Sequence, residues 1–550
     1  MSLPAESTVP GRTAVRLPRQ AGPEPRTTAR PAPGPGPAPA PSARRAAATA
    51  ALCFALTAAI GLQSWLTGRV GGFDLGIFDQ GVRSYAHLQL PHSAIKNVHH
   101  GFPAGFSLLG DHFSPVLALL APLYWVWDDP RMLVLAQSAL FAAGVPVVRR
   151  IAAHCLAARP GAVSAAADTT GLVYALGWPL CTAASVGFHE VAFAVPLTLL
   201  LLERGLARRY RSVLLCAALL ACTKEDLGLV VGVYGLVLAA RAHRRADRRG
   251  TATGAVLLAA GPLCSAAAIR WAVPAFGGRP DYYWSYGSLG PDGGSALARI
   301  LADPGVLLHT ATTPLIKPAL LLWLLGTLLL LPLGSATALL AVPLLAERVL
   351  SDNPNHWPAT HHYDAFVWPI LLVASVEVLG RLAGAGRPRL RRAGRALAAG
   401  AVACNLAATC CMGLYGLANP RIWKPRPDRS ALVRAAALIP DGASVEADNN
   451  VAPHLTPRTD VVLVDAVPHG REYVVIRSGV RAFPFADVGQ QQERIRLLLA
   501  HGYETVWSGD GVVLLRRTRT EPIPGMRDPA SGGPVRDVVP PDVGRNLFRG

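Results

Sequence analysis

Apolar stretches alternate with short polar or basic stretches along most of the chain, and this alternation predicts a bundle of membrane-crossing helices. A helix needs about 20 apolar residues to cross a bilayer, and some of the stretches are shorter than that. The first stretch is too long for the core of a signal peptide, so we expect it to remain as a helix. The pattern predicts about eleven helices, at residues 46–66, 131–148, 166–186, 191–203, 212–223, 227–240, 253–274, 314–332, 335–349, 365–381 and 396–417.

The composition supports a membrane protein and excludes a single soluble core. Of the 550 residues, 51% are hydrophobic, and the mean hydropathy is +0.32. A formal net charge of +18 is also typical of nucleic-acid-binding proteins, but here the arginines lie in short runs between apolar stretches, as in cytoplasmic loops. We therefore expect membrane lipids and no nucleic acid as partners.

The arginines also predict the orientation of the helices. Basic runs at 149–159, 204–211, 241–249 and 381–395 occupy alternate loops, which are predicted to be cytoplasmic. The N-terminus is then cytoplasmic, the protein crosses the plasma membrane several times, and the loop at 68–130 lies outside. An odd number of helices places the C-terminal region outside as well.

Two interruptions of the apolar pattern leave alternatives open. Residues 212–240 form either one helix, with the Thr-Lys-Glu-Asp segment 223–226 in hydrocarbon, or a hairpin of two short helices around that segment. The hairpin is preferred because charges in hydrocarbon are costly. The apolar segment 113–127 is assigned to the outer loop as an interfacial or re-entrant helix, since counting it as a span would put Arg149 outside.

A small α/β domain is predicted outside the membrane at residues 419–517. Short alternating runs there predict strands, and the amphipathic run QQERIRLLLAHG predicts a helix. The predicted strands are SVEAD, DVVLVD, YVVIRSG, ETVWS and GVVLLRR. Tails rich in Pro and Gly at 1–42 and 518–550 are predicted to be disordered, which leaves 43–418 for the membrane domain.

The predicted outer loops hold many ionisable side chains. A phosphate leaving group needs Lys or His donors and a hydroxyl acceptor needs a carboxylate base, and both types are present. Structural roles stay open too, because Asp caps helices, Lys reaches lipid head groups, and the adjacent His361 and His362 lack the spacing of a helical metal pair. The candidates are Asp74, Asp79, Asp111, His112, His189, Glu190, Lys224, Glu225, His361, His362, Tyr363 and Asp364.

Several motifs, taken in order, resemble one bacterial and archaeal membrane family, called domain of unknown function 2079. The motifs are FDLGIFDQ, GDHFSP, GFHE, TKED, HHYDAF, and APHLTPR with VVLVD, and the resemblance covers residues from about 50 to 515. The family in turn is similar to the GT-C glycosyltransferases, membrane enzymes that take sugars from polyprenyl phosphates. The resemblance implies a GT-C-like α-helical polytopic membrane protein with a small extracytoplasmic α/β domain at its C-terminus.

The resemblance also implies inverting transfer of a sugar from a polyprenyl-phosphate donor to an extracytoplasmic acceptor. Asp74 lies in the first outer loop, where the superfamily has its catalytic base. His189 and Glu190 match a turn that binds metal or donor phosphate, and Lys224 matches a lysine between two short helices. The superfamily's acidic pair is replaced here by Asp74 and Asp79, both taken as catalytic. The other candidates are expected to bind substrate, and a divalent metal is left open as a cofactor.

A transporter or flippase of a lipid or polar solute is the alternative, because ionisable residues in membrane proteins also line substrate pathways. Transport favours an inverted repeat and charges near the midplane, whereas no repeat is evident in the sequence and the polar clusters lie at predicted helix ends. A non-catalytic assembly or sensor protein is a further alternative. The motif APHLTPR, residues 452–458, is interpreted as a structural connection between a strand and a turn.

Overall fold

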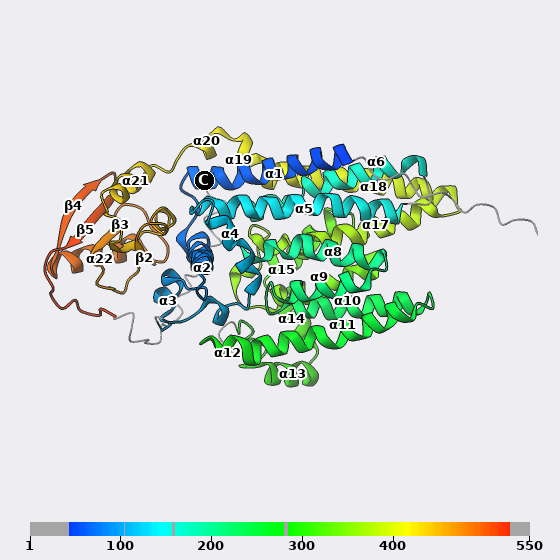
Figure 1. Ribbon diagram of the computed structural model, residues 1–550, viewed down its shortest axis with the longest axis horizontal. Coiled ribbons are helices and arrows are strands. Elements are labelled where there is room, and N and C mark those ends of the chain that lie inside the picture. Colours follow the sequence, from blue (N-terminus) through cyan, green and yellow to red (C-terminus); the bar gives the residue numbers. More distant parts are fainter. Residues whose placement is uncertain (1–42, 104, 157–159, 280–283, 528–550) are drawn as a thin grey trace, which may run out of the picture. The chain divides into compact units, whose positions relative to one another are not determined.

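The computed structural model describes residues 43–103, 105–156, 160–279 and 284–527. The predicted tail 1–42 lies outside these residues, as do residues 528–550 of the second predicted tail. Most of the described chain is helical, and one small sheet lies near the C-terminus (Figure 1).

Helices form at the predicted apolar stretches, and shorter ones lie in the connections. The first group comprises α1 (Ala43–Leu66), α5 (Arg131–Cys155), α6 (Pro160–Ala175), α7 (Trp178–Ser185), α8 (Ala194–Leu206), α9 (Tyr210–Ala221), α10 (Leu227–His243), α11 (Arg248–Ala267), α12 (Val273–Ala275), α15 (Ile316–Gly326), α16 (Val342–Leu350), α17 (Trp368–Gly384) and α18 (Pro388–Thr409). The second comprises α2 (Ile77–Ala86), α3 (Ala94–His100), α4 (Ala121–Tyr124), α13 (Gly293–Ala302), α14 (Gly305–Thr312), α19 (Tyr415–Ala418) and α20 (Pro420–Trp423).

The described residues contain 5 helical segments that are long and apolar enough to cross a membrane, or up to 6 if α14 and α15, bent by 77° at the break between them, form one span. The 5 segments are Ala43–Leu66, Arg131–Cys155, Arg248–Ala275, His362–Gly384 and Pro388–Ala418. Three further apolar helices, Pro115–Tyr124, Tyr210–Ala221 and Leu227–His243, are shorter. The predicted class, a helical polytopic membrane protein, is confirmed, while the number of about eleven spans stays a prediction.

Proline and glycine shorten several of the predicted helices. The stretch 166–186 is divided into α6 and α7 at Gly177, and Pro179 stands in the first turn of α7, where its missing N–H costs no hydrogen bond. The stretch 335–349 is one helix only at its end, because 3₁₀ turns precede α16. In the stretch 212–240, α9 ends at Ala221 and α10 begins at Leu227, which confirms the hairpin.

Glycines allow α10 and α11 to lie against each other. A Cβ atom on Gly228 would lie 2.4 Å from the carbonyl oxygen of Gly261, and one on Gly235 would lie 2.6 Å from that of Gly254. Any larger residue at these positions would push the two backbones apart. Such small residues are typical of contacts between membrane helices, where close packing has to replace the hydrophobic effect.

The predicted inner and outer loops lie at opposite ends of the long helices. The C-terminal ends of α5 and α10 lie away from the sheet (Figure 1). Arg149 of α5 pairs with Asp168, and the guanidinium of Arg241 of α10 lies 2.8 Å from Glu377. The outer loop 68–130 lies at the other end, where α3 packs against the sheet (Figure 1). This separation agrees with the predicted topology, although which end faces the cytoplasm stays a prediction.

The C-terminal sheet confirms the predicted strands. Its order is β2-β1-β3-β5-β4; β1 pairs in parallel with β2 and β3, while β5 is antiparallel to β3 and β4. The strands are β1 (Ser444–Ala447), β2 (Asp460–Leu463), β3 (Tyr473–Arg477), β4 (Tyr503–Gly509) and β5 (Val512–Arg517), with helices α21 (Arg429–Ala437) and α22 (Val488–Ala500).

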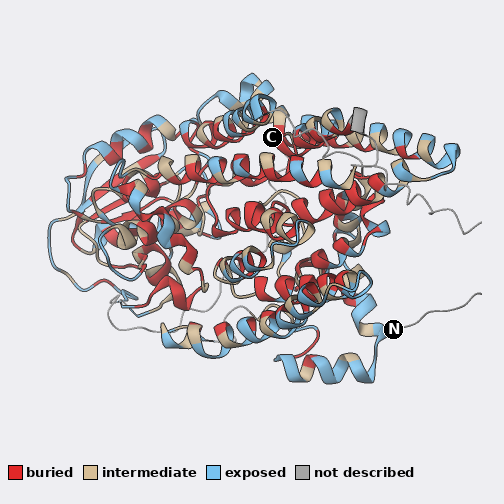
Figure 2. Ribbon diagram, turned by 45° about the vertical axis from the view of Figure 1, so that its right-hand side comes forward, coloured by how far each residue is buried: buried red, intermediate tan, exposed pale blue. Residues whose placement is uncertain are grey.

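The outer loop supplies part of the core of this domain. On one side of the sheet, α22 packs against β3, β4 and β5. The core on the other side contains α21 together with Ile77, Ile95 and Leu108 of the outer loop, which join Val461 and Leu463 of the sheet. Each such side chain stabilises the contact by about 1.5–3 kcal/mol when it is fully buried. The core of the sheet therefore extends into the outer loop, and its buried residues are among those drawn red in Figure 2.

Candidate functional site

Asp74 lies in a short π-helical turn, Gly72–Gly76, that precedes α2. Its side chain is 44% exposed, and its Oδ1 atom lies 3.6 Å from Nε2 of His189. A carboxylate in this state is reachable by a substrate and can accept a proton. The two predicted candidates Asp74 and His189, far apart in the sequence, are thus brought together.

His189 connects Asp74 to the motif HHYDAF. Its backbone N–H donates to Oε1 of Gln137 at 3.3 Å, and its ring stacks on His362 with ring centroids 3.5 Å apart. The His362 ring in turn lies 4.2 Å from the Tyr363 ring. The rings of His189, His362 and Tyr363 therefore form one row, and Asp74 lies beside His189 at its end.

His361 and His356 complete the histidine cluster around this row. Burial lowers the pKa of His361, although the charge of Asp74 opposes that shift. The Nδ1 atoms of His189, His356 and His362 are buried and have no hydrogen-bond partner among the described residues. Because buried polar atoms are normally paired, these nitrogens are positions where a polar ligand could bind.

Lys224 lies beside this cluster, in the turn between α9 and α10. Its Nζ atom is 3.1 Å from Oδ2 of Asp226 and 3.7 Å from Oε1 of Glu347. Burial lowers the pKa of Lys224, but the carboxylates of Asp226, Glu347, Glu225 and Glu190 together raise it well above its ordinary value. The lysine therefore carries its positive charge, and Glu190, itself buried, is one of the groups that keep it charged.

Glu225 and His112 bind each other. Nδ1 of His112 lies 2.8 Å from Oε1 of Glu225, and the Phe113 N–H donates to the other carboxylate oxygen at 3.0 Å. Although burial opposes both charges, the attraction raises the pKa of His112 to about 9 and lowers that of Glu225 to about 2. This pair fastens the 223–226 turn to the outer loop.

Asp111 and Asp364 also form ion pairs with basic side chains. Asp111 lies 3.0 Å from the Lys96 ammonium, and both side chains are buried. Asp364 is paired with Arg348, whose other nitrogens donate to the carbonyls of His356 at 2.8 Å and Pro358 at 3.0 Å. These pairs hold the loops in place around the site.

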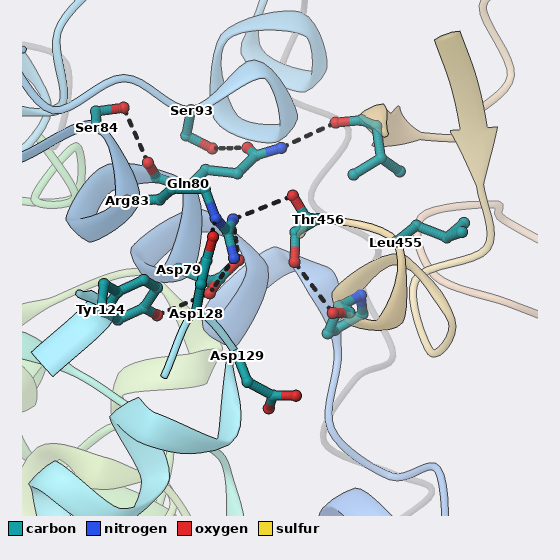
Figure 3. A network of polar contacts seen from close by, with 12 residues as sticks. Asp79, Gln80, Arg83, Ser84, Ser93, Tyr124, Asp128, Asp129, Leu455 and Thr456 are labelled. Atoms are coloured by element: carbon teal, nitrogen blue, oxygen red, sulfur yellow. Dashed lines mark hydrogen bonds and ion pairs between the residues drawn. The ribbon is translucent and has the colours of Figure 1, made fainter. Parts of the chain in front are cut away.

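Asp79 differs from Asp74 in being fully buried inside a network of polar contacts (Figure 3). Two nitrogens of Arg83 donate to its carboxylate at 2.7 and 3.1 Å, and the Tyr124 hydroxyl donates at 2.7 Å. Burial raises the pKa of Asp79 above its ordinary value, and Arg83 opposes that shift. The network spans α2, α4 and the C-terminal domain, because Arg83 also donates to the carbonyl of Thr456 at 3.1 Å.

The partners of these charged side chains were not among the residues singled out in the sequence. Arg83 carried a usable signal, since it stands four residues after Asp79 on a helix, the spacing of a helical ion pair. The sequence pattern identified none of the other partners, which are Lys96, Arg348 and Glu347. They lie outside the motifs and are not at helical spacing from the residues with which they pair. Within the described residues, no three His, Cys, Asp or Glu side chains are placed to hold one metal ion.

Comparison with known proteins identifies a family and several similar structures. The model of the family described as "Predicted membrane protein (DUF2079)" matches residues 69–514. No curated protein sequence matches this chain. ArnT from Cupriavidus metallidurans, solved bound to undecaprenyl phosphate, is similar with 14% identity over 85% of this chain and 98% of that chain, at a TM-score of 0.44. An oligosaccharyltransferase from Archaeoglobus fulgidus, tethered to an acceptor peptide, is also similar. The identity is 11% over 86% of this chain and 74% of that chain, at a TM-score of 0.44.

Proposed function

The chain belongs to the DUF2079 family of predicted membrane proteins, and we propose that it is a membrane glycosyltransferase that moves a sugar from a polyprenyl-phosphate donor to a hydroxyl group of an extracytoplasmic acceptor. One observation carries the proposal: the reachable carboxylate of Asp74 lies 3.6 Å from His189, beside histidines whose Nδ1 atoms have no hydrogen-bond partner among the residues that the structure describes. The similarity of the DUF2079 family, which the ordered motifs resemble, to the GT-C enzymes suggests the substrate class. The site would face the outside of the plasma membrane.

Asp74 acts as the general base in this proposal. The acceptor hydroxyl gives its proton to the Asp74 carboxylate while its oxygen bonds to the anomeric carbon of the sugar. The bond between that carbon and the phosphate oxygen breaks on the opposite face, which inverts the configuration. Nε2 of His189 orients the carboxylate from a distance of 3.6 Å.

Lys224 and the histidines bind the leaving phosphate. Lys224 is charged and its side chain is only 13% exposed, so its attraction for an anion is stronger than it would be in water. The buried Nδ1 atoms of His189 and His362 supply further hydrogen-bonding positions. The lipid tail of the donor lies among the apolar helices, and no step in this mechanism passes through a metal ion.

The test is the mass-spectrometric profile of envelope glycans and glycolipids in a deletion strain complemented with wild type or with Asp74→Asn. Loss of a general base reduces a rate by roughly 10²–10⁴-fold, so the variant should fail to restore a glycan that wild type restores. Asp128→Asn is the matched control, because the side chain of Asp128 is also 44% exposed but pairs with Arg83 instead of a histidine.

Three outcomes separate the candidate functions. A glycan restored by wild type and Asp128→Asn but not by Asp74→Asn supports transfer chemistry at Asp74. A glycan restored by all three proteins contradicts it. Accumulation of an unmodified lipid-linked sugar on the cytoplasmic side of the membrane in the deletion strain would favour the flippase instead.

A further inference from the structure

Asn449, which follows β1 in the C-terminal domain, binds the backbone immediately before Asp74. The Gly72 N–H donates to the Asn449 carbonyl at 2.7 Å, and the Phe73 N–H donates to the Asn449 side-chain oxygen at 2.9 Å. The first N–H groups of a helical turn have no partner within the turn itself. Asn449 therefore caps, from another domain, the turn that carries Asp74.

Glycines 71 and 72 make this contact sterically feasible. A Cβ atom on Gly71 would lie 2.4 Å from Nδ2 of Asn449, and one on Gly72 would lie 2.7 Å from the Cβ atom of Ala452. Real Cβ atoms essentially never come so close to another atom, so a larger residue would move the turn away from the domain. Ala452 begins the motif APHLTPR, which is thus part of the contact and more than a connection between a strand and a turn.

Helix α2, which continues from the same turn, is held by the same domain. Arg83 donates to the Thr456 carbonyl at 3.1 Å (Figure 3). Nε2 of Gln80 donates to the Val461 carbonyl at 3.1 Å. The domain thus contacts the beginning of the turn and two successive turns of the helix after it. Its hydrogen bonds to this segment are made at residues 72, 73, 80 and 83.

We propose that the C-terminal domain positions Asp74 for reaction and that Asn449 is the positioning residue that fixes the Asp74 turn. This inference rests on the proposed role of Asp74 as the base. His189, in the helical membrane domain, lies 3.6 Å from Asp74. The Asp74 turn is therefore contacted by both the membrane domain and the C-terminal domain. A displacement of about 1 Å at a reacting group can cost roughly 10²-fold in rate, so this contact would govern activity without touching the substrate.

The first measurement is hydrogen–deuterium exchange of the full-length protein purified in detergent, followed on peptides that cover residues 70–76. Asn449→Ala removes the acceptor for the Phe73 N–H and should speed exchange there by about fivefold, the factor expected for one lost hydrogen bond. Asn449→Asp keeps an acceptor oxygen and should retain the protection. Gln492→Ala is the matched control, since it deletes a side-chain amide of the same domain that, among the described residues, donates to the Ser478 carbonyl and not to the Asp74 turn.

The second measurement is the glycan profile of strains that carry the same variants. Asn449→Ala and Gly71→Ala should both lower the Asp74-dependent glycan at unchanged protein abundance, whereas Asn449→Asp and Gln492→Ala should restore it. Unchanged exchange in Asn449→Ala would overturn the inference, and so would faster exchange with full restoration of the glycan. If Asp74→Asn itself restores the glycan, the proposed function fails, and the exchange data show separately whether Asn449 holds the turn.

Discussion

Asp74 and Asp79 belong to the same motif, FDLGIFDQ, but the structure puts them in opposite states. The Asp74 side chain is 44% exposed and faces a histidine, whereas Asp79 has no exposed surface and is bound by Arg83 and Tyr124. The contrast shows that two acids of one motif can divide the work. In the function proposed above, Asp74 takes part in the reaction, and Asp79 holds α2 in place.

The strongest test of this division is Asp79→Ala. Asp79 is fully buried, and removing its carboxylate deprives both the Arg83 guanidinium, whose side chain is 14% exposed, and the Tyr124 hydroxyl of their shared partner. Breaking a buried ion pair from one side typically costs about 3–5 kcal/mol. The unfolding midpoint of the purified protein in detergent should fall accordingly. If the midpoint stays at the wild-type value, Asp79 does not hold the outer loop and returns to the list of catalytic candidates.

A second paired acid, Glu225, sharpens the comparison through pH. The pKa of His112 is raised from 6.5 to about 9, so the stability it contributes is complete below pH 6.5 and is lost as the pH rises through 9. The pKa of Glu225 is lowered from 4.5 to about 2, so its contribution is lost only as the pH falls through 2. A charged hydrogen bond of this kind stabilises by about 1.5–3 kcal/mol.

Between pH 6.5 and 9, the unfolding midpoint of the wild-type protein should therefore fall more steeply with pH than that of His112→Gln, whose glutamine cannot titrate. The difference between the two curves isolates His112 from the other groups that titrate in the same range. Parallel curves would mean that the His112–Glu225 pair adds no stability.

The smallest effect is expected from Asp74→Asn. A side chain that is 44% exposed and lies 3.6 Å from a histidine ring contributes little to stability, so the free energy of unfolding should change by less than about 0.5 kcal/mol. The same unfolding assay measures it. A loss as large as that of Asp79→Ala would show that Asp74 is structural, and any loss of glycan in that variant would then reflect misfolding.

Much of the fold could be predicted because it follows local patterns. The apolar stretches specified the helices, and the alternating runs specified all strands of the sheet. Helix ends within stretches such as 335–349 could not be predicted, because packing and proline decide there between α-helix and 3₁₀ turns. The number of spans depends on the membrane as well as the chain.

The candidate site could be predicted only as a set of residue types on one side of the membrane. The positions of Asp74, His189, His362 and Lys224 were found in the sequence, yet Asp79 and Asp74 were indistinguishable there. Burial separates them, and burial depends on α4 and the C-terminal domain, which are remote in the sequence. Asn449 lay in no motif and carried no signal, because its role comes from a contact across 376 residues.

The sequence by itself determined the membrane class, the helical and α/β regions and the side chains available for chemistry, because hydrophobic periodicity and charge placement act over short distances. The tertiary structure alone decided which acids are neutralised, which histidines stack and which domain holds the Asp74 turn. These outcomes depend on contacts between distant segments, where a shift of a few ångströms decides whether a carboxylate meets a guanidinium or remains open to a substrate.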